Sequence, residues 1–338
     1  MNFSLIIPVY NGGETFRETL DAVQQCSPPP TEVFVVDDGS TDGSDRVAAE
    51  YRVRVVSIPG PSGPATARTR GAEAAQGDIL VFTDADVLIP GDLFLLLGED
   101  FSREEVSAVQ GTFSDECPFG NFCSVYKNLY NRYVINALPE WIDTTFTSLT
   151  AVRREIFFAC GGFDCNISTP SVEDRTLGRN LVRFGAKILL DRRIEVVHHK
   201  ELTLLGFIRN QFRRSRDLAR LLLRNRKDKG KSSAAPKSFD PKGRFGTNAP
   251  STMARIPVAY LGTAALIASF LWSEAWPLAM ICLGIFLGLA YPFTRYLVRE
   301  EGLGFAFVSL LLNFLDAVVS GAGVAWGMFS FIVFGRRY

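Results

Sequence analysis

Two carboxylates that close an apolar run are the residues of this sequence with the clearest chemistry. Asp84 and Asp86 flank Ala85, and only Thr83 separates them from residues 78–82, which we predict to be a buried strand. Side chains alternate along extended backbone, so the two carboxylates point the same way. Together with the phosphate oxygens of a substrate, such carboxylates hold Mg²⁺ or Mn²⁺. The alternative is a solvated turn, or an N-cap for a helix that starts near Asp92.

A second acidic pair, Asp37 and Asp38, ends the apolar run 32–36. These carboxylates can accept hydrogen bonds from a nucleobase or from ribose hydroxyls, although the Gly-Ser-Thr-Asp that follows is also an ordinary turn. Further along, the loop 60–64 feeds a helix that carries Arg68. A helix start beside an arginine can cradle a diphosphate, and the alternative is a plain loop with a solvent-facing side chain.

A third acidic pair, Glu173 and Asp174, stands before the predicted helix 175–184. One of the two could supply a general base, because a carboxylate can take the proton of an attacking hydroxyl. The same pair could instead cap the helix, and spacing alone favours the cap. The residues by themselves therefore leave both roles open.

Strand and helix patterns alternate through the N-terminal part of the chain. We predict strands at 3–9, 32–36, 53–58 and 78–82, alternating with helices at 14–25, 42–51 and 65–76. This alternation predicts a parallel, doubly wound α/β sheet. Ligands bind such sheets beyond the carboxyl ends of the strands, where the first two acidic pairs lie. The sequence has neither GxGxxG after the first strand nor GxxxxGKS/T, which excludes a dinucleotide-binding Rossmann site and a P-loop.

Taken together, these segments resemble the family 2 glycosyltransferases of the GT-A fold over roughly residues 3–220. The resemblance rests on the order and spacing of six motifs: Ile7-Pro8-Val9-Tyr10-Asn11, Val36-Asp37-Asp38-Gly39-Ser40-Thr41-Asp42, Gly63-Pro64-Ala65 with Ala67-Arg68 and Gly71, Thr83-Asp84-Ala85-Asp86, Gly161-Gly162-Phe163-Asp164, and Glu173-Asp174. It implies a mixed, mainly parallel sheet and the inverting transfer of a sugar from a nucleotide donor. It also implies a divalent cation, Mg²⁺ or Mn²⁺, as the cofactor.

The resemblance further implies a role for each matching residue. Asp86 and Asp84 would hold the metal and the diphosphate, His198 would approach them, and Asp174 would be the catalytic base. The donor would lie against Pro8, Tyr10, Asp38, Gly63, Arg68, Asp84 and Ala85. The acceptor and the membrane interface would face Glu173, Gln211 and Arg214.

Two positions depart from the pattern of the family. Thr69 follows Arg68 where the family often has asparagine, which puts that contact in doubt. Family members that make polymers carry a Gln-x-x-Arg-Trp motif, and here Ser215 replaces the tryptophan after Gln211 and Arg214. The second departure argues against a processive polysaccharide synthase.

Charge divides the chain into three regions, although its formal net charge is zero. Residues 1–202 hold 18 basic and 29 acidic side chains, a net charge of −11. Residues 203–255 hold 14 basic and 3 acidic side chains, a net charge of +11, and residues 256–338 hold 4 of each. An amphipathic basic helix over 202–225 suits an anionic bilayer surface, and nucleic acid is not an expected partner.

Apolar segments in the last quarter predict a membrane domain over 256–335. We expect spans at about 256–272, 275–294 and 304–335, because about 17–25 apolar residues cross a bilayer core of ~30 Å. The basic segment 202–255 then lies on the cytoplasmic side, as the positive-inside rule prefers. The last segment is too long for one upright span, so an interfacial helix before a span and a re-entrant hairpin both stay open.

These observations predict a catalytic domain over 1–201 that faces the cytoplasm from a multi-pass anchor in the cytoplasmic membrane. Its expected activity is metal-dependent, inverting transfer of a sugar from a nucleotide-diphosphate sugar to a lipid-linked or glycan acceptor of the cell envelope, with membrane lipid as a further partner. The alternatives are a processive polysaccharide synthase and a non-catalytic nucleotide-sugar-binding membrane subunit. The complete acidic set argues against the non-catalytic subunit. The sequence determines neither the donor, the acceptor and the linkage nor the oligomeric state.

Overall fold

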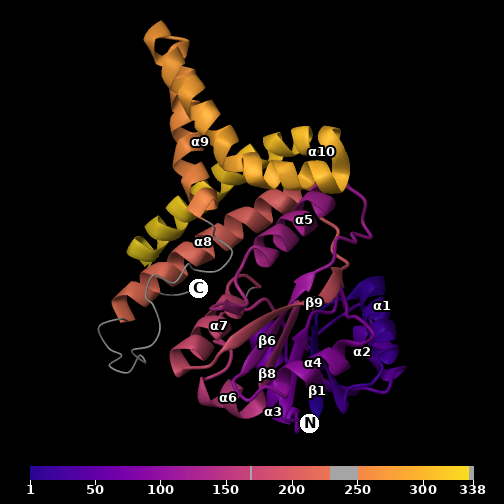
Figure 1. Ribbon diagram of the computed structural model, residues 1–338. Helices are drawn as coiled ribbons and strands as arrows, with labels where there is room; N and C mark the ends of the chain where they lie inside the picture. Colours follow the sequence, from indigo (N-terminus) through magenta and orange to yellow (C-terminus); the bar gives the residue numbers. More distant parts are fainter. Residues whose placement is uncertain (168–169, 229–249, 335–338) are drawn as a thin grey trace.

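The computed structural model describes residues 1–167, 170–228 and 250–334, and shows a sheet domain beside a set of C-terminal helices (Figure 1). Residues 229–249 of the basic segment 202–255 and residue 335, the end of the last expected span, lie outside the described residues. The two parts meet where α5 (Phe122–Asn136), α8 (Leu204–Asp228) and α10 (Trp276–Phe334) come together.

The centre of the sheet domain is one mixed sheet in the order β3-β2-β1-β4-β8-β6-β9-β5, with β7 paired to β9. The strands are β1 (Phe3–Val9), β2 (Glu32–Asp37), β3 (Arg54–Ser57), β4 (Ile79–Thr83), β5 (Val87–Leu88), β6 (Ala108–Phe113), β7 (Trp141–Ile142), β8 (Leu149–Arg153) and β9 (Ile188–His198). Strands β3, β2, β1 and β4 are parallel, as the alternation of strands and helices predicts. Strand β8 enters antiparallel between β4 and β6, which makes the sheet mixed, as the family resemblance implies.

The sheet is buried because its central strands are apolar on both faces. Leu5, Ile6 and Ile7 on consecutive positions of β1 are fully buried. Strands of parallel sheets covered on both sides by helices show this continuous apolar pattern. The covering helices are α1 (Gly13–Gln24), α2 (Ser44–Ala49), α3 (Pro64–Ala74), α4 (Leu93–Phe101), α6 (Arg154–Ala159) and α7 (Glu173–Phe184).

The C-terminal helices form a hairpin and a return helix (Figure 1). Helix α9 (Pro250–Ser269) and the first part of α10 make the hairpin, which projects away from the sheet domain. Helix α10 breaks at Gly302, whose φ of 84° is a value that glycine adopts without steric cost. Beyond this break, a single helix runs back along α8 to Phe334.

Two glycines let the return helix lie almost against the backbone of α8. A Cβ atom on Gly323 would collide with the carbonyl oxygen of Phe212, and one on Gly327 with that of Arg216. Small residues four positions apart allow this close approach of helices. The pairing holds Asp316, in the same helix, beside Gln211 of α8.

The hairpin has the composition of a membrane anchor. The helical stretch Ser273–Phe334 is long and apolar enough to cross a membrane, and Met253–Ser269 is a shorter apolar helix. At the tip, Phe270 is 84% exposed and Leu271 is 75% exposed. The spans expected at 256–272 and 275–294 fall on the two arms of the hairpin, and membrane insertion stays a prediction.

Candidate active site

A cavity of about 1040 Å³ opens at the carboxyl ends of the strands and extends to α5, α8 and α10. Every residue singled out from the sequence as a site residue lines it: Pro8, Tyr10, Asp38, Gly63, Arg68, Asp84, Ala85, Asp86, Glu173, Asp174, His198, Gln211 and Arg214. The structure thus brings the acidic strand ends, the start of α7 and the basic helix α8 to one place. Their individual roles stay proposals.

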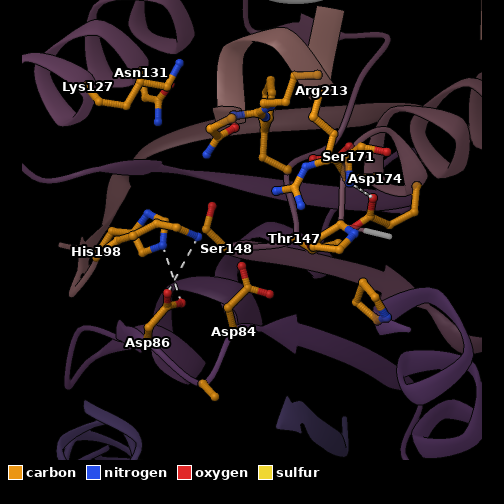
Figure 2. A pocket seen from close by; sticks show the side chains of 18 of the residues that line it. Asp84, Asp86, Lys127, Asn131, Thr147, Ser148, Ser171, Asp174, His198 and Arg213 are labelled. Atoms are coloured by element: carbon orange, nitrogen blue, oxygen red, sulfur yellow. Dashed lines mark hydrogen bonds and ion pairs between the residues drawn. The ribbon is translucent and has the colours of Figure 1, made fainter. Parts of the chain in front are cut away.

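Asp86 lies beside His198 because the short strand β5 pairs with β9. Val87, the residue after Asp86, is opposite His198 in this pairing. The His198 Nε2 atom is 3.4 Å from Asp86 Oδ1 (Figure 2). Lys200 Nζ is 3.9 Å from Asp86 Oδ2. Burial acts to raise the pKa of Asp86, but the attraction of His198 and Lys200 outweighs it, so the pKa lies well below its usual range.

The donor set of Asp86 and His198 fits a divalent cation that is completed by a substrate. The Nε2 atom of His198 is buried and has no hydrogen-bond partner within the described residues. No group of three potential metal-binding side chains gathers in that part of the chain. Mg²⁺ commonly takes one or two carboxylates and fills its other positions with water and phosphate oxygens. The pair therefore suits a metal bound together with a diphosphate, and does not suit an all-protein metal centre.

Arg68 is buried between two carboxylates instead of pointing to solvent. It forms an ion pair with Asp84, and its Nη1 atom is 3.4 Å from Glu173 Oε1. Burial acts to lower the pKa of Arg68, but the carboxylates more than offset this, so the pKa is raised. Arg68 thus neutralises Asp84 and joins the start of α7 to the end of β4, while Asp86 is left to face the cavity beside His198.

Asp38 holds the loop that precedes α3. Its two carboxylate oxygens each accept a 2.7 Å hydrogen bond, one from the backbone N–H of Ser62 and one from that of Gly63. Gly60 of the same loop lies so close to the backbone of Asp38 that a Cβ atom would clash there. The carboxylate therefore positions the loop against β2, at the side of the cavity where Pro8 lies.

Asp174 is a buried carboxylate with a pKa near neutrality. It stands in the first turn of α7, where its Oδ1 atom accepts a hydrogen bond of 2.7 Å from the N–H of Arg175. Burial and the neighbouring charge of Glu173 raise its pKa to about 6, although Arg214 and Arg175 counteract them. A general base works best when its pKa lies near the working pH, so Asp174 is suited to that task.

The helices add cavity residues outside the predicted site. Among them, the sequence marks Asp316 as a helix contact, a point on a lipid-substrate path or an aspartate at the membrane boundary. Lys127 comes from α5, Arg213 comes from α8 and Asp316 comes from α10. Lys127 Nζ donates to Gln211 Oε1 at 3.2 Å, and Gln211 Nε2 donates to the Asp316 carboxylate. Asp316 was a detectable signal as the one charge within residues 302–335, but nothing in the local pattern distinguishes Lys127.

Comparison with known proteins identifies the sheet domain. Residues 4–161 match the family described as "Glycosyl transferase family 2". These residues form a family 2 glycosyltransferase domain. The predicted family and the GT-A fold are thereby confirmed for this domain.

The glycosyltransferase domain has bacterial relatives. The putative teichuronic acid biosynthesis glycosyltransferase TuaG of Bacillus subtilis (strain 168) is 38% identical over 88 residues, which cover 25% of this chain and 35% of TuaG. The O-antigen chain rhamnosyltransferase WbaN of Salmonella anatum is 26% identical over 215 residues, which cover 60% of this chain and 67% of WbaN. The chain spans little more than a third of the length of some curated relatives, with 38% of GlyG from Streptococcus pneumoniae covered.

A solved structure shares the fold over most of the chain. It is the mannosyltransferase PcManGT from Pyrobaculum calidifontis in complex with GDP-Man and Mn²⁺, with a TM-score of 0.64 and 22% sequence identity. The superposition covers 92% of this chain and 87% of PcManGT. At this identity the likeness shows the fold alone.

Proposed function

We propose that this chain is a metal-dependent, inverting glycosyltransferase. It moves a sugar from a nucleotide-diphosphate sugar to a lipid-linked or glycan acceptor at the cytoplasmic face of a membrane. One observation carries the proposal: the Asp86–His198 pair and the buried Asp174 line the same cavity, with Asp86 and Asp174 on different sides of it (Figure 2). A metal–diphosphate and a deprotonated acceptor need this separation.

The donor belongs on the sheet side of the cavity. Asp86 and His198 would hold the cation, which when bound supplies charge neutralisation to the departing diphosphate. Tyr10 is 51% exposed at the cavity and offers an aromatic face to a nucleobase. Asp38 fixes the neighbouring loop, and Arg68 fixes Asp84 next to Asp86.

The acceptor belongs on the side of Asp174. Its carboxylate takes the proton from the acceptor hydroxyl while the hydroxyl oxygen forms a bond to the anomeric carbon of the donor. The bond from that carbon to the diphosphate oxygen breaks, and the nucleoside diphosphate leaves with the electron pair. Attack from the face opposite the leaving group inverts the configuration of the anomeric carbon. Because Asp174 is largely ionised above pH 6, it can act as the base at neutral pH.

The C-terminal helices support a membrane location for the acceptor. The hairpin of α9 and α10 exposes large apolar side chains at its tip, and segment 203–255 carries a net charge of +11. Apolar surface of this extent marks an interaction with lipid or protein, and basic residues beside it favour an anionic bilayer. The relatives TuaG and WbaN are named for teichuronic acid and O-antigen, which agrees with an acceptor in the cell envelope.

The experiment is a donor panel assayed with the full chain and a membrane lipid extract, with mass spectrometry of the products. We expect one nucleotide sugar to be consumed with Mg²⁺ or Mn²⁺, and EDTA to stop the reaction. If the chain consumes none of the nucleotide sugars with either cation, the proposed activity is wrong.

Asp174→Asn tests the base within this reaction. We expect transfer to fall by about 10²–10⁴-fold, the usual contribution of a general base, while nucleotide binding stays within about twofold. Asp45→Asn is the matched control, because Asp45 is exposed on α2 and lies outside the cavity. If Asp174→Asn abolishes nucleotide binding as well, Asp174 belongs to the donor site and the base is another group.

A further inference from the structure

The side of the cavity that faces the acidic strand ends is basic. Lys127 comes from α5, and Arg213 and Arg214 come from α8. Figure 2 shows Lys127 and Arg213 across the cavity from Asp84 and Asp86. We call Lys127, Arg213 and Arg214 the cationic patch.

The side chains of the cationic patch make no direct ion pair within the described residues, although Asp316 attracts Lys127 and Asp174 attracts Arg214 from nearby. Arg68, by contrast, forms two ion pairs with carboxylates. The Nε atom of Arg213 is buried and makes no hydrogen bond to the described residues. A buried, unpaired guanidinium donor is costly, and such groups in a cavity mark a place for a ligand.

A network from the last helix holds Lys127 in place. Its ammonium donates to Gln211, whose amide donates to Asp316 of α10, and Ser320 Oγ lies 3.3 Å from the same carboxylate. The Lys127 ammonium also lies 5.0 Å from the ring centre of Tyr130. Only one of its three N–H bonds is used by Gln211, so the network fixes the ammonium and leaves donors for a ligand.

The chemistry of the patch selects phosphate. An arginine presents two parallel N–H donors that match phosphate oxygens, and a lysine adds a point charge. A neutral glycan would instead need both donors and acceptors around it. Burial is the main reason that the pKa of Lys127 is lowered to about 7. Arg214 and Arg175 lower this pKa further and Asp316 counteracts them, so a bound anion would favour the charged ammonium. The diphosphate of the donor already has a place beside Asp86 and His198, so a second phosphate must belong to the other substrate.

We propose that the cationic patch binds a phosphate group carried by the acceptor. The inference rests on the proposed function, because it takes Asp86 and His198 as the place of the donor diphosphate. The phosphate can belong to a lipid, presented where α8 and α10 meet, or to a soluble sugar phosphate. Both carry the same group, and binding measurements separate them.

The experiment compares ligands that differ only in their phosphate. Binding of farnesyl phosphate and farnesol to the full chain in detergent is measured by calorimetry, and glucose 1-phosphate is compared with glucose in the same way. We expect one phosphate ester to bind at least about tenfold more tightly than its alcohol, because a charged hydrogen bond is worth about tenfold or more. Preference for farnesyl phosphate assigns a lipid acceptor, and preference for glucose 1-phosphate a soluble one.

Variants of the patch then locate the phosphate. Arg213→Gln and Arg214→Gln should each weaken binding of the preferred phosphate about tenfold or more, and leave binding of UDP or GDP with Mn²⁺ within about twofold. Arg209→Gln is the matched control, because Arg209 is an exposed arginine of α8 outside the cavity. Thermal melting of each variant checks that it is folded.

Three results would overturn the inference. Equal binding of both phosphate esters and their alcohols would mean that the patch does not recognise phosphate. An equal loss of UDP or GDP binding in Arg214→Gln would assign the patch to the donor. If the wild type binds the phosphate ester but no nucleotide with Mn²⁺, the proposed function fails, and the patch is an anion site without an acceptor role.

Discussion

The sheet side and the helix side of the cavity differ in whether their arginine side chains form ion pairs. Arg68, on the sheet side, is neutralised by Asp84 and Glu173. Arg213 and Arg214, on the helix side, form no ion pair with a carboxylate within the described residues, although Asp174 attracts Arg214. A charge that is neutralised within the fold holds its neighbours in position, and its removal leaves buried charges uncompensated. A charge without a partner contributes little to folding and is available to a ligand.

The largest effect should come from the residue that would bind the cation. Asp86→Ala should lower the rates of both transfer and donor hydrolysis by about 10³-fold or more. A bound metal lowers the free energy of the charged transition state by several kcal/mol. The exposed Asp45→Ala should keep wild-type rates. Initial rates at saturating Mn²⁺ measure both, and wild-type turnover in Asp86→Ala would remove Asp86 from the metal site.

Replacing Arg68 tests whether the ion pairs on the sheet side of the cavity stabilise the fold. Arg68→Gln should lower the free energy of unfolding by about 3–5 kcal/mol, since it leaves Asp84 and Glu173 without their partner. Arg70→Gln on the same helix removes only an exposed pair with Glu73, so it should change the free energy by less than about 1 kcal/mol. Urea unfolding measures both variants. Equal effects would mean that the ion pairs of Arg68 do not hold the site together.

The pH profile tests how the two sides act on Asp174. The base works only when deprotonated, and its pKa is raised to about 6, so kcat/KM should fall below about pH 6. A solvent-exposed aspartate, whose pKa is about 3.9, would keep activity down to about pH 4. Arg214 lowers the pKa of Asp174, so Arg214→Gln should move the acid limb to higher pH, and Arg209→Gln should not. If the acid limb does not move, Arg214 does not lower the pKa of Asp174.

The smallest effect should be the change in the free energy of unfolding when Arg214, on the helix side of the cavity, is replaced. Arg214→Gln removes repulsion from Lys127 and Arg175 but also attraction to Asp174. These contributions oppose one another, so the free energy of unfolding should stay within about 0.5 kcal/mol of the wild type. Urea unfolding at pH 7 gives the comparison with Arg68→Gln. A loss as large as that of Arg68→Gln would show that Arg214 is a structural cation.

Much of the sheet domain could be predicted from local sequence. Strands are expected at residues 3–9, 32–36 and 53–58, and β1, β2 and β3 lie there. The runs of β1 and β2 are almost entirely apolar and end at polar residues, which is the pattern of a buried parallel strand, whereas β3 lies at the edge of the sheet and is mostly exposed. The antiparallel β8 was not predicted, because whether a strand runs parallel or antiparallel depends on its partners and not on its own residues.

The candidate site was predictable where acidic residues follow the ends of apolar strands. Asp38, Asp84 and Asp86 close apolar strands, and the carboxyl ends of parallel strands share one edge of the sheet. The partner of Arg68 was not predictable, since a helix sequence does not say which carboxylates will lie above it. Lys127 was missed for the same reason, because its neighbours Gln211 and Asp316 belong to other helices.

The sequence by itself determined the acidic motifs, the family they belong to, and the apolar hairpin that follows a basic segment. Composition and spacing are local properties, and these features need nothing more. Only the tertiary structure decided that β5 brings Asp86 to His198, and that α10 returns Asp316 to Gln211. These contacts depend on which surfaces pack, and the approach of α10 to α8 required glycine at Gly323 and Gly327. A close fit between distant segments therefore made one cavity from an acidic domain and a basic helix.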